Sequence, residues 1–539
     1  MGVLGDVARV PDVRRVEVGW ALCLTGGMIA TVALLIYAFT AGGAALVAAF
    51  AVSEAVVRAV MSSVTSSLGD RIGRDRLLRW TASLAAVFMA LAALAATMGA
   101  SPGVAIALAV LSSGFRGSYR PLQAAILPWL VRTPAELTAA NVTSTIMEST
   151  GRLIGPAIAG VVLLVSSAQA AIAVAAAFIA LSWLSTWRLR VPDQSLVVPD
   201  DSGMTWRDIS VGAHAVWQVG RPGGLAVLAV AQTFARGVLT VALVVFALEV
   251  LQLGEDSVGW LNAAMGLGGL LGGVLAVSLV RITRLGRSFA AGIALWGVPL
   301  LLLAAVPQTA VAYLALIVIG VGNAFADGAM YTLLPRLVGS RIAGRALGAL
   351  ELLVFAGLAA GALAAPLLVA GLGPRGGFLV AGTLIVVPVV AYASRFARID
   401  RTLPAPGPEL DLLRGLPMFQ HLPLVIVEQL AESLEAHEYE RGDVVMRQGA
   451  PGEQFHVVRR GSASVMVDGR PRPSLVVGDC FGEIALLRDI PRTATVIAGE
   501  DLATLVLPRS DFLSAVTGHQ TSAEHGHALA RRRLAADPD

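Results

Sequence analysis

Apolar stretches of about twenty residues dominate the first 396 residues, and this is the length that an α-helix needs to cross a bilayer. Short polar connections, many of them containing arginine, separate the stretches. The pattern predicts an α-helical membrane protein with twelve transmembrane helices, at residues 17–39, 43–67, 78–98, 103–127, 140–166, 170–189, 223–250, 257–280, 288–304, 309–334, 345–370 and 376–396.

The pattern changes after residue 396. An apolar-periodic stretch from Leu412 to Leu434 predicts a helix, and short alternating runs punctuated by glycine follow from Tyr439 onward. Such runs predict a small β-barrel or jelly roll with flanking helices. We therefore expect a membrane domain at 1–396, a Pro-rich linker at 397–410 and a soluble domain at 411–539.

Composition narrows the class of protein. Of the 539 residues, 56% are hydrophobic and 14% are charged, whereas soluble domains carry about 25% charged residues. This excludes an ordinary soluble enzyme, and the net charge of +3 with high hydrophobicity excludes a disordered chain. The sequence contains no metal-ligand spacing, nucleophile elbow or phosphate loop of the Walker type, so we expect no enzymatic activity and no cofactor.

Every basic residue is arginine, and the arginines gather in alternate connections between the predicted helices. The other connections contain only Arg375. By the positive-inside rule this asymmetry predicts cytoplasmic N- and C-termini in a bacterial inner (plasma) membrane. The arginines form no basic stripe, so no nucleic-acid partner is expected, and the sequence leaves an oligomer open.

The two halves of the membrane region are similar at one fixed offset. The segment Leu127–Val131 reappears 207 residues later as Leu334–Val338, and residues 66–69 face residues 273–276 at the same shift. The shared offset predicts a six-plus-six repeat, an arrangement common in secondary transporters.

The connection after the second predicted helix, residues 66–76, resembles the signature loop of the major facilitator superfamily. Its matching positions are Asp70, Arg71, Gly73 and Arg74, whereas Ser66 and Asp75 depart from the family pattern. The resemblance covers residues 1–396 and implies that this loop acts as a conformational latch. The segment 148–156 also looks like the fifth helix of exporter-type members of the superfamily.

Charged residues occur within several predicted helices, where each is costly unless it faces a partner or an aqueous cavity. In the superfamily's fold, the helices that carry them line the central cavity. We expect the following residues to line a transport cavity: Glu54, Arg58, Arg116, Glu148, Arg152, Arg236 and Asp327.

The spacing leaves two interpretations for some of these charges. Glu54 with Arg58, and Glu148 with Arg152, are spaced as i,i+4 ion pairs that would merely neutralise each other. Arg116 and Arg236 have no local acid and favour a substrate or coupling role. Asp327 either binds a proton, because burial favours a neutral carboxyl, or pairs with Arg236 across the cavity.

The soluble domain contains a second motif, at Phe481-Gly482-Glu483-Ile484-Ala485 and, after a short gap, Arg492-Thr493-Ala494. Glycine permits close approach of a ligand to the backbone, a short helix beginning there presents free N–H groups, and arginine suits a phosphate. From about Leu412 to Val516 the chain resembles the cyclic nucleotide-binding domain family, and the motif resembles its phosphate-binding cassette.

This resemblance implies that Glu483 holds the ribose 2′-hydroxyl and Arg492 the cyclic phosphate, while Gly482, Ala485, Thr493 and Ala494 complete the phosphate cradle. Thr493 resembles a residue that helps cGMP binding in some members, but cAMP-preferring members also carry it, so it leaves the purine open. The expected regulatory ligand is cAMP, with cGMP as the alternative. The final Arg531–Arg533 run either covers the purine or is a solvated end.

Together these patterns predict a secondary active transporter, exporting a small molecule in exchange for protons, that is regulated by a cyclic nucleotide bound in the cytoplasm. The alternative is a non-transporting receptor or anchor whose helices merely hold the nucleotide sensor in the membrane.

Overall fold

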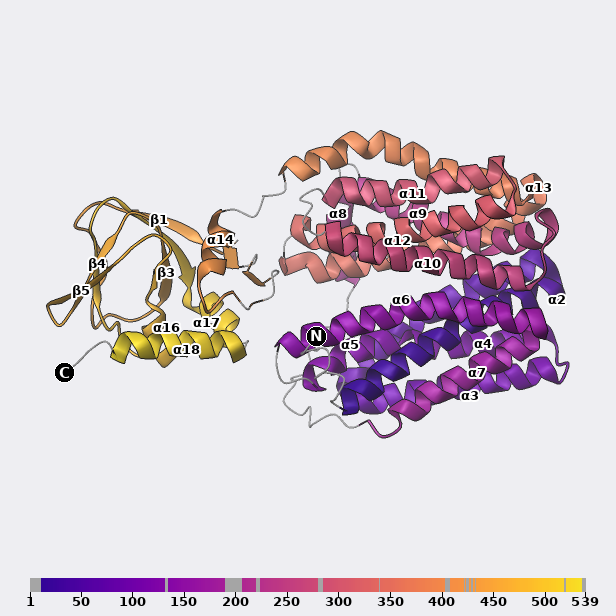
Figure 1. Cartoon of the computed structure of the whole chain (residues 1–539), viewed down its shortest axis with the longest axis horizontal. Coiled ribbons are helices and arrows are strands. Elements are labelled where there is room, and N and C mark those ends of the chain that lie inside the picture. Colours follow the sequence, from indigo (N-terminus) through magenta and orange to yellow (C-terminus); the bar gives the residue numbers. More distant parts are fainter. Residues whose placement is uncertain are drawn as a thin grey trace. The chain divides into compact units, whose positions relative to one another are not determined.

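In a computed structural model the chain folds into two compact units (Figure 1). One comprises Met1–Arg132 and Glu136–Leu403, and the other comprises Pro404–Asp539 with Thr133–Ala135. The structure describes residues 11–130, 134–189, 206–219, 223–279, 285–338, 340–402, 408–420, 422, 426–427, 430–431, 433–517 and 520–535.

The first unit is helical. Its elements are α2 (Pro11–Ile72), α3 (Arg74–Thr97), α4 (Pro102–Gly117), α5 (Tyr119–Leu130), α6 (Pro134–Val165), α7 (Ala168–Thr186), α8 (Trp206–Gln218), α9 (Gly224–Val245), the π-helix η1 (Phe246–Val250), α10 (Asp256–Leu279), α11 (Leu285–Ala305), α12 (Thr309–Val338) and α13 (Ser340–Thr402). Figure 1 shows α3, α4 and α7 packed together, and α9 to α13 gathered in a second group.

Within the described residues, nine helices are long and apolar enough to cross a membrane. Two of them are far longer than one crossing, since their apolar parts run over Pro11–Met61 and Gly344–Asp400. The backbone leaves the helical conformation at Gly42 and Gly43 in α2 and at Gly373 in α13. The membrane region is therefore helical and multi-span, and the count of twelve spans stays a prediction.

The second unit is rich in β-strands. They are β1 (Glu435–Tyr439), β2 (Val444–Met446), β3 (Gln454–Arg460), β4 (Ala463–Val467), β5 (Arg470–Leu475), β6 (Cys480–Phe481), β7 (Thr495–Ala498) and β8 (Leu502–Pro508). They form two four-stranded antiparallel sheets, in the orders β1-β8-β3-β6 and β2-β7-β4-β5. This is the expected β-rich domain.

Four helices whose bounds lie within the described residues accompany the sheets: α14 (Pro408–Gly415), α16 (Glu483–Arg488), α17 (Arg509–Thr517) and α18 (Gln520–Ala535). Phe419, Phe455 and Phe512 form an aromatic cluster in the core between sheet and helices. Residues 426–427 and 430–431 are helical as expected, but the helical stretch predicted at 412–434 is not continuous, because α14 ends at Gly415. Gly415 and Pro417 explain this end, since both residues disfavour a continuing helix.

Candidate functional site

Gly482 joins β6 to the short helix α16 in the predicted phosphate-binding cassette. Its φ of +89° lies in the left-handed region that favours glycine. A Cβ at this position would lie 2.5 Å from Nη1 of Arg492 and 2.9 Å from the carbonyl oxygen of Gln454. The turn and the close approach of the arginine therefore both require glycine.

Arg492 is buried, with 6% of its surface exposed. Its Nη1 donates to the carbonyl of Gly482 at 3.0 Å, and its Nη2 donates to the carbonyl of Gln454 at 2.7 Å. These bonds hold the planar cation beside the start of α16. Burial lowers the pKa of this guanidinium, but an arginine starts from so high a value that it stays charged at neutral pH.

Glu483, the first residue of α16, has its side chain almost fully buried. Its Oε1 accepts a hydrogen bond from Nη1 of Arg533, at 2.8 Å, and the same Nη1 also donates to the carbonyl of Cys480. Burial is the largest single influence on Arg533 and lowers its pKa, but the charge and hydrogen bond of Glu483, together with Cys480 and Asp479, raise the pKa by more. The carboxylate thus already has a cationic partner on α18.

The other cassette residues lie around this pair. Phe481 is buried in β6, and Ala485 is buried in α16. Ile484 is half-buried, as are Thr493 and Ala494 in the bend before β7. The structure thus gathers all eight predicted residues in one place, whereas Arg533 was expected only as part of a covering or solvated arginine run.

His456 lies behind the cassette and was not singled out from the sequence. Its ring stacks on Phe481 with the centroids 4.7 Å apart, and its Nδ1 lies 3.4 Å from Oγ1 of Thr504. Burial, with a smaller contribution from the charge of Arg492, lowers the pKa of His456 to about 3. The histidine is therefore neutral in the folded domain.

This burial predicts a pH-dependent stability. Between pH 3 and 6.5 the unfolded histidine binds a proton that the folded one does not, so stability falls as the pH falls through this window. Between pH 7 and pH 5, urea unfolding of fragment 404–539 should show a loss about 2 kcal/mol larger in the wild type than in His456→Gln. His527→Gln, a change at an exposed histidine of α18, should keep the wild-type loss; equal losses in wild type and His456→Gln would refute the prediction.

In the membrane region, two predicted pairs are formed within single helices. In α2, Nη1 of Arg58 lies 3.6 Å from Oε1 of Glu54. In α6, Nη2 of Arg152 lies 2.6 Å from Oε1 of Glu148. The i,i+4 interpretation of these four residues therefore describes their geometry. Their pairing does not separate a structural from a transport role.

Arg236 and Asp327 are joined through a third residue. Nη2 of Arg236 donates to Oδ1 of Asn323 at 2.6 Å, and Nδ2 of Asn323 donates to Oδ2 of Asp327 at 2.8 Å. Arg236 also lies over the ring of Trp296, 5.3 Å from its centroid. The expected pairing is thus indirect and connects α9, α11 and α12. Arg152 of α6 also interacts electrostatically with Asp327, so charges from both halves of the membrane region meet here.

Arg116 lies near the end of α4 and packs against α2. Its Nη1 would be 2.1 Å from a Cβ at residue 27, so the guanidinium fits only because that residue is glycine. Its buried Nε has no hydrogen-bond partner in the described part of the chain. A buried donor without a partner is costly, which distinguishes Arg116 from the paired arginines.

Glu17 is a buried acid that the sequence reasoning missed. Its Oε1 accepts a hydrogen bond from Oγ of Ser144, which in turn accepts one from Gln123. Arg120 donates weakly to the same Gln123, at 3.4 Å. Glu17 is the first residue of the helix predicted at 17–39, and the search for charges within the predicted helices did not include it.

The predicted latch lies between α2 and α3. Gly73 breaks the helix with a φ of +89°, and Nη1 of Arg74 donates to the carbonyl of Ala125 at 3.4 Å. The side chains of Asp70 and Arg71 lie outside the described residues.

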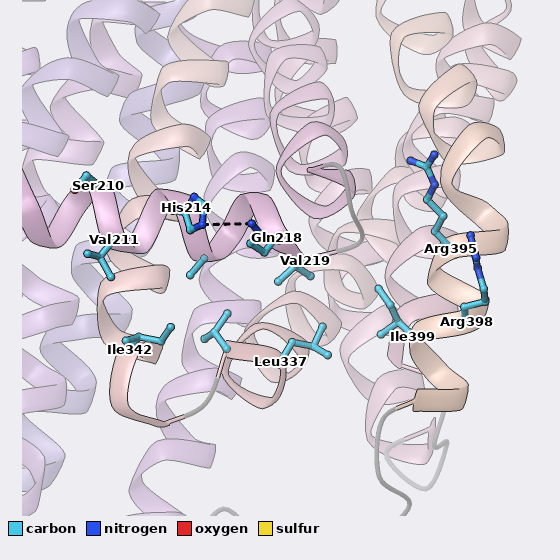
Figure 2. A pocket seen from close by; sticks show the side chains of 12 residues that line it. Ser210, Val211, His214, Gln218, Val219, Leu337, Ile342, Arg395, Arg398 and Ile399 are labelled. Carbon is cyan, nitrogen blue, oxygen red and sulfur yellow. Dashed lines mark hydrogen bonds between the residues drawn. The ribbon is translucent and has the colours of Figure 1, made fainter.

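A cavity of about 980 Å³ lies beside the amphipathic helix α8 (Figure 2). In Figure 2, His214 and Gln218 of α8 lie on one side, joined by a contact of 3.3 Å, and Arg395 and Arg398 of α13 lie on the other. The apolar side chains of Leu337 and Ile342 also line the cavity. None of the predicted cavity charges lines this space.

Comparison with known proteins separates the two parts of the chain. The model of the Major Facilitator Superfamily matches residues 225–435, and that of the cyclic nucleotide-binding domain matches residues 436–519. A solved structure of a variant of the nucleoside transporter NupG has a TM-score of 0.57 and 14% identity, and the match covers 72% of this chain and all of that one. It shows the transporter fold alone.

Two curated relatives each match about a fifth of this chain. The cAMP-dependent protein kinase regulatory subunit of Eremothecium gossypii is 39% identical over 103 residues, which are 19% of this chain and 22% of that protein. The cGMP-dependent protein kinase 2 of Homo sapiens is 33% identical over 109 residues, 19% of this chain and 14% of that one. The chain therefore spans less than a quarter of the length of these relatives.

These matches agree with the cassette geometry and the helical membrane fold, and they confirm both resemblances inferred from the sequence. Neither kind of domain is catalytic. The chain is a multi-pass membrane protein that combines a transporter domain of the major facilitator superfamily with a C-terminal cyclic nucleotide-binding domain.

Proposed function

We propose that this protein is a proton-coupled exporter of a small molecule, with twelve transmembrane helices, and that cyclic nucleotide binding to its C-terminal domain regulates transport. The proposal places it in a bacterial inner membrane with both termini in the cytoplasm. The intact cassette and the buried Arg492 favour a cyclic nucleotide, and similarity to cAMP-dependent kinase regulatory subunits makes cAMP the proposed ligand. cGMP is the alternative because a cGMP-dependent kinase is similar over the same region.

The network of Arg236, Asn323 and Asp327 carries the transport proposal. Charges inside a membrane protein are costly and mark pathways for ions, protons or substrates. Here a carboxylate and a guanidinium from different helices share one amide, and Arg152 of α6 acts on the same carboxylate. A protein that only anchors a sensor needs no such network, so its presence favours transport over the receptor alternative.

The geometry of the cassette supports the proposed binding of a cyclic nucleotide. Arg492 is fixed by two carbonyls, and Gly482 leaves room for its guanidinium. Both features preserve the chemistry that a cyclic phosphate requires, namely a planar cation beside a helix start. The proposed holders of the nucleotide are Glu483 for the ribose and Arg492 for the phosphate, with Thr493 and Ala494 at the cradle.

Transport should change several-fold when cAMP is added, and should not switch on or off completely. A ligand shifts a conformational equilibrium only by its differential affinity for the two states, typically about 1–3 kcal/mol. The measurement uses the full-length protein in vesicles with a lumenal pH indicator, a panel of candidate substrates and either saturating cAMP or none.

The matched control for this experiment is the same protein with Arg492→Ala, which should transport but need about tenfold to a hundredfold more cAMP for the same response. Linkage also requires a transported substrate to alter cAMP affinity by the same factor. If no compound moves protons while cAMP still binds, the receptor alternative replaces the transporter proposal. If transport occurs and neither effect of cAMP is seen, regulation fails and transport remains.

A further inference from the structure

A second cavity, of about 870 Å³, lies at one end of the membrane region and plays no part in the proposed transport pathway. It opens where α2 begins, α3 begins and α7 ends, three elements that belong to the same compact unit. Figure 1 shows α3 and α7 side by side. The residues that line it are Arg15, Arg76, Arg79, Trp80, Ser83, Trp183, Trp187 and Arg188.

The arginines of this cavity are only partly neutralised. Arg15 pairs with Asp12 at 2.7 Å, and Arg79 pairs with Asp75 at 3.2 Å. Arg76 and Arg188 are exposed, and neither makes an ion pair or hydrogen bond with another residue in the described ranges. Two guanidinium groups therefore face the cavity region without a carboxylate partner among the residues that the structure describes, and the cavity suits an anion.

The aromatic wall places the cavity at the level of the lipid headgroups. Trp80 is 67% exposed and Trp187 is 56% exposed, although both side chains are large and apolar. Trp183 packs edge-on against Trp187, with the ring centroids 5.1 Å apart. Tryptophan at the ends of transmembrane helices lies in the interface between hydrocarbon and water.

The arginines and tryptophans of this cavity together favour a ligand that has both a phosphate and an apolar part. Guanidinium groups bind phosphate oxygens in a planar, two-pronged geometry, and exposed indole rings pack against glycerol and the first acyl carbons. Basic pockets between transmembrane helices bind anionic headgroups. A freely soluble phosphate would use the arginines but gain nothing from Trp80 and Trp187.

We propose that this cavity binds the headgroup of an anionic phospholipid, with Arg76 and Arg188 holding the phosphate and Trp80 and Trp187 contacting the lipid beside it. Arg76 follows Gly73 and Arg74 of the predicted latch by two to three residues. The lipid would thus bind next to the α2–α3 connection. This inference is independent of the substrate and of the nucleotide.

Native mass spectrometry of the full-length protein, released from micelles that contain phosphatidylglycerol or phosphatidylcholine, tests the proposal. The wild type should retain phosphatidylglycerol in preference to phosphatidylcholine. The double variant Arg76→Gln/Arg188→Gln should weaken retention of phosphatidylglycerol about tenfold or more, because two charge-assisted contacts are lost. The matched control Arg395→Gln/Arg398→Gln removes the same charge from the cavity beside α8 and should retain wild-type binding.

Trp80→Ala provides a second variant that changes an exposed side chain and no charge. It should weaken phosphatidylglycerol retention, whereas inorganic phosphate at millimolar concentration should not displace the lipid. The proposal is overturned if both double variants lose the lipid equally, if phosphatidylglycerol and phosphatidylcholine bind alike, or if inorganic phosphate competes. Unchanged retention in Trp80→Ala would equally overturn the aromatic contact and with it the lipid assignment.

Discussion

Replacing Arg492 by alanine is expected to weaken cAMP binding by about tenfold to a hundredfold. A hydrogen bond to a charged group contributes roughly 1.5–3 kcal/mol, and the variant loses the cation proposed to hold the cyclic phosphate. It also leaves the carbonyls of Gly482 and Gln454 without their donors. Isothermal titration calorimetry on fragment 404–539, and on the full-length protein, measures the change.

Two further variants test whether binding requires the guanidinium of Arg492 itself or only a positive charge near the site. Arg488→Ala removes an exposed cation from α16, the helix that precedes Arg492, and should leave the affinity unchanged. Arg492→Lys keeps the charge without the planar fork, so it should bind better than the alanine variant and worse than the wild type. If the wild type gives no heat with cAMP or cGMP, the cassette has lost its function, and equal affinity in Arg492→Ala would assign the phosphate to other groups.

Replacing Asp327 by asparagine is expected to abolish proton-driven transport while preserving exchange of substrate across the membrane. An asparagine keeps an oxygen that can accept the hydrogen bond from Asn323, so the bridge to Arg236 is preserved and only the titratable charge is removed. Transport against a gradient requires that group to bind and release a proton, whereas exchange at equal concentrations does not. Both are measured in vesicles that contain the purified full-length protein.

The control for this experiment is Glu255→Gln, which removes an exposed carboxylate just before α10. It should transport like the wild type. If Asp327→Asn still accumulates substrate against its gradient, proton coupling through this residue is wrong, and Glu17 becomes the next buried carboxylate to test in the described membrane region.

The nucleotide cassette could be predicted because its chemistry is contiguous. Residues 481–494 carry the glycine, the carboxylate and the arginine within one turn-helix-turn segment, so local order alone brings them together. The pairing of Glu483 with Arg533 could not be predicted, because fifty residues separate them and the arginine run looked like a solvated end. His456 was missed for a similar reason, since its burial depends on how β3 and β6 pair.

The membrane region was predictable in its class and less so in its details. Apolar length identified the helices, and the connections predicted at 40–42 and 371–375 lie at or beside Gly42, Gly43 and Gly373, where the backbone leaves the helical conformation. Asn323 was overlooked because a search for charges ignores amides, although its i,i+4 spacing from Asp327 was visible in the sequence. Side-chain networks between distant helices depend on packing that no single segment encodes.

The ion pair between Glu483 and Arg533 bears on how quickly the nucleotide site can respond. Removing one partner from a buried ion pair costs about 3–5 kcal/mol, more than the roughly 1.5–3 kcal/mol of a hydrogen bond between a hydroxyl and a carboxylate. If Glu483 holds the ribose as proposed, the ribose hydroxyl should share the carboxylate with Arg533, which uses Oε1, and not displace it. Helix α18 should then stay docked on the occupied site, and the nucleotide should dissociate only when that end of the helix opens locally. The response to a falling nucleotide concentration would therefore be limited by the rate of this opening as well as by the affinity.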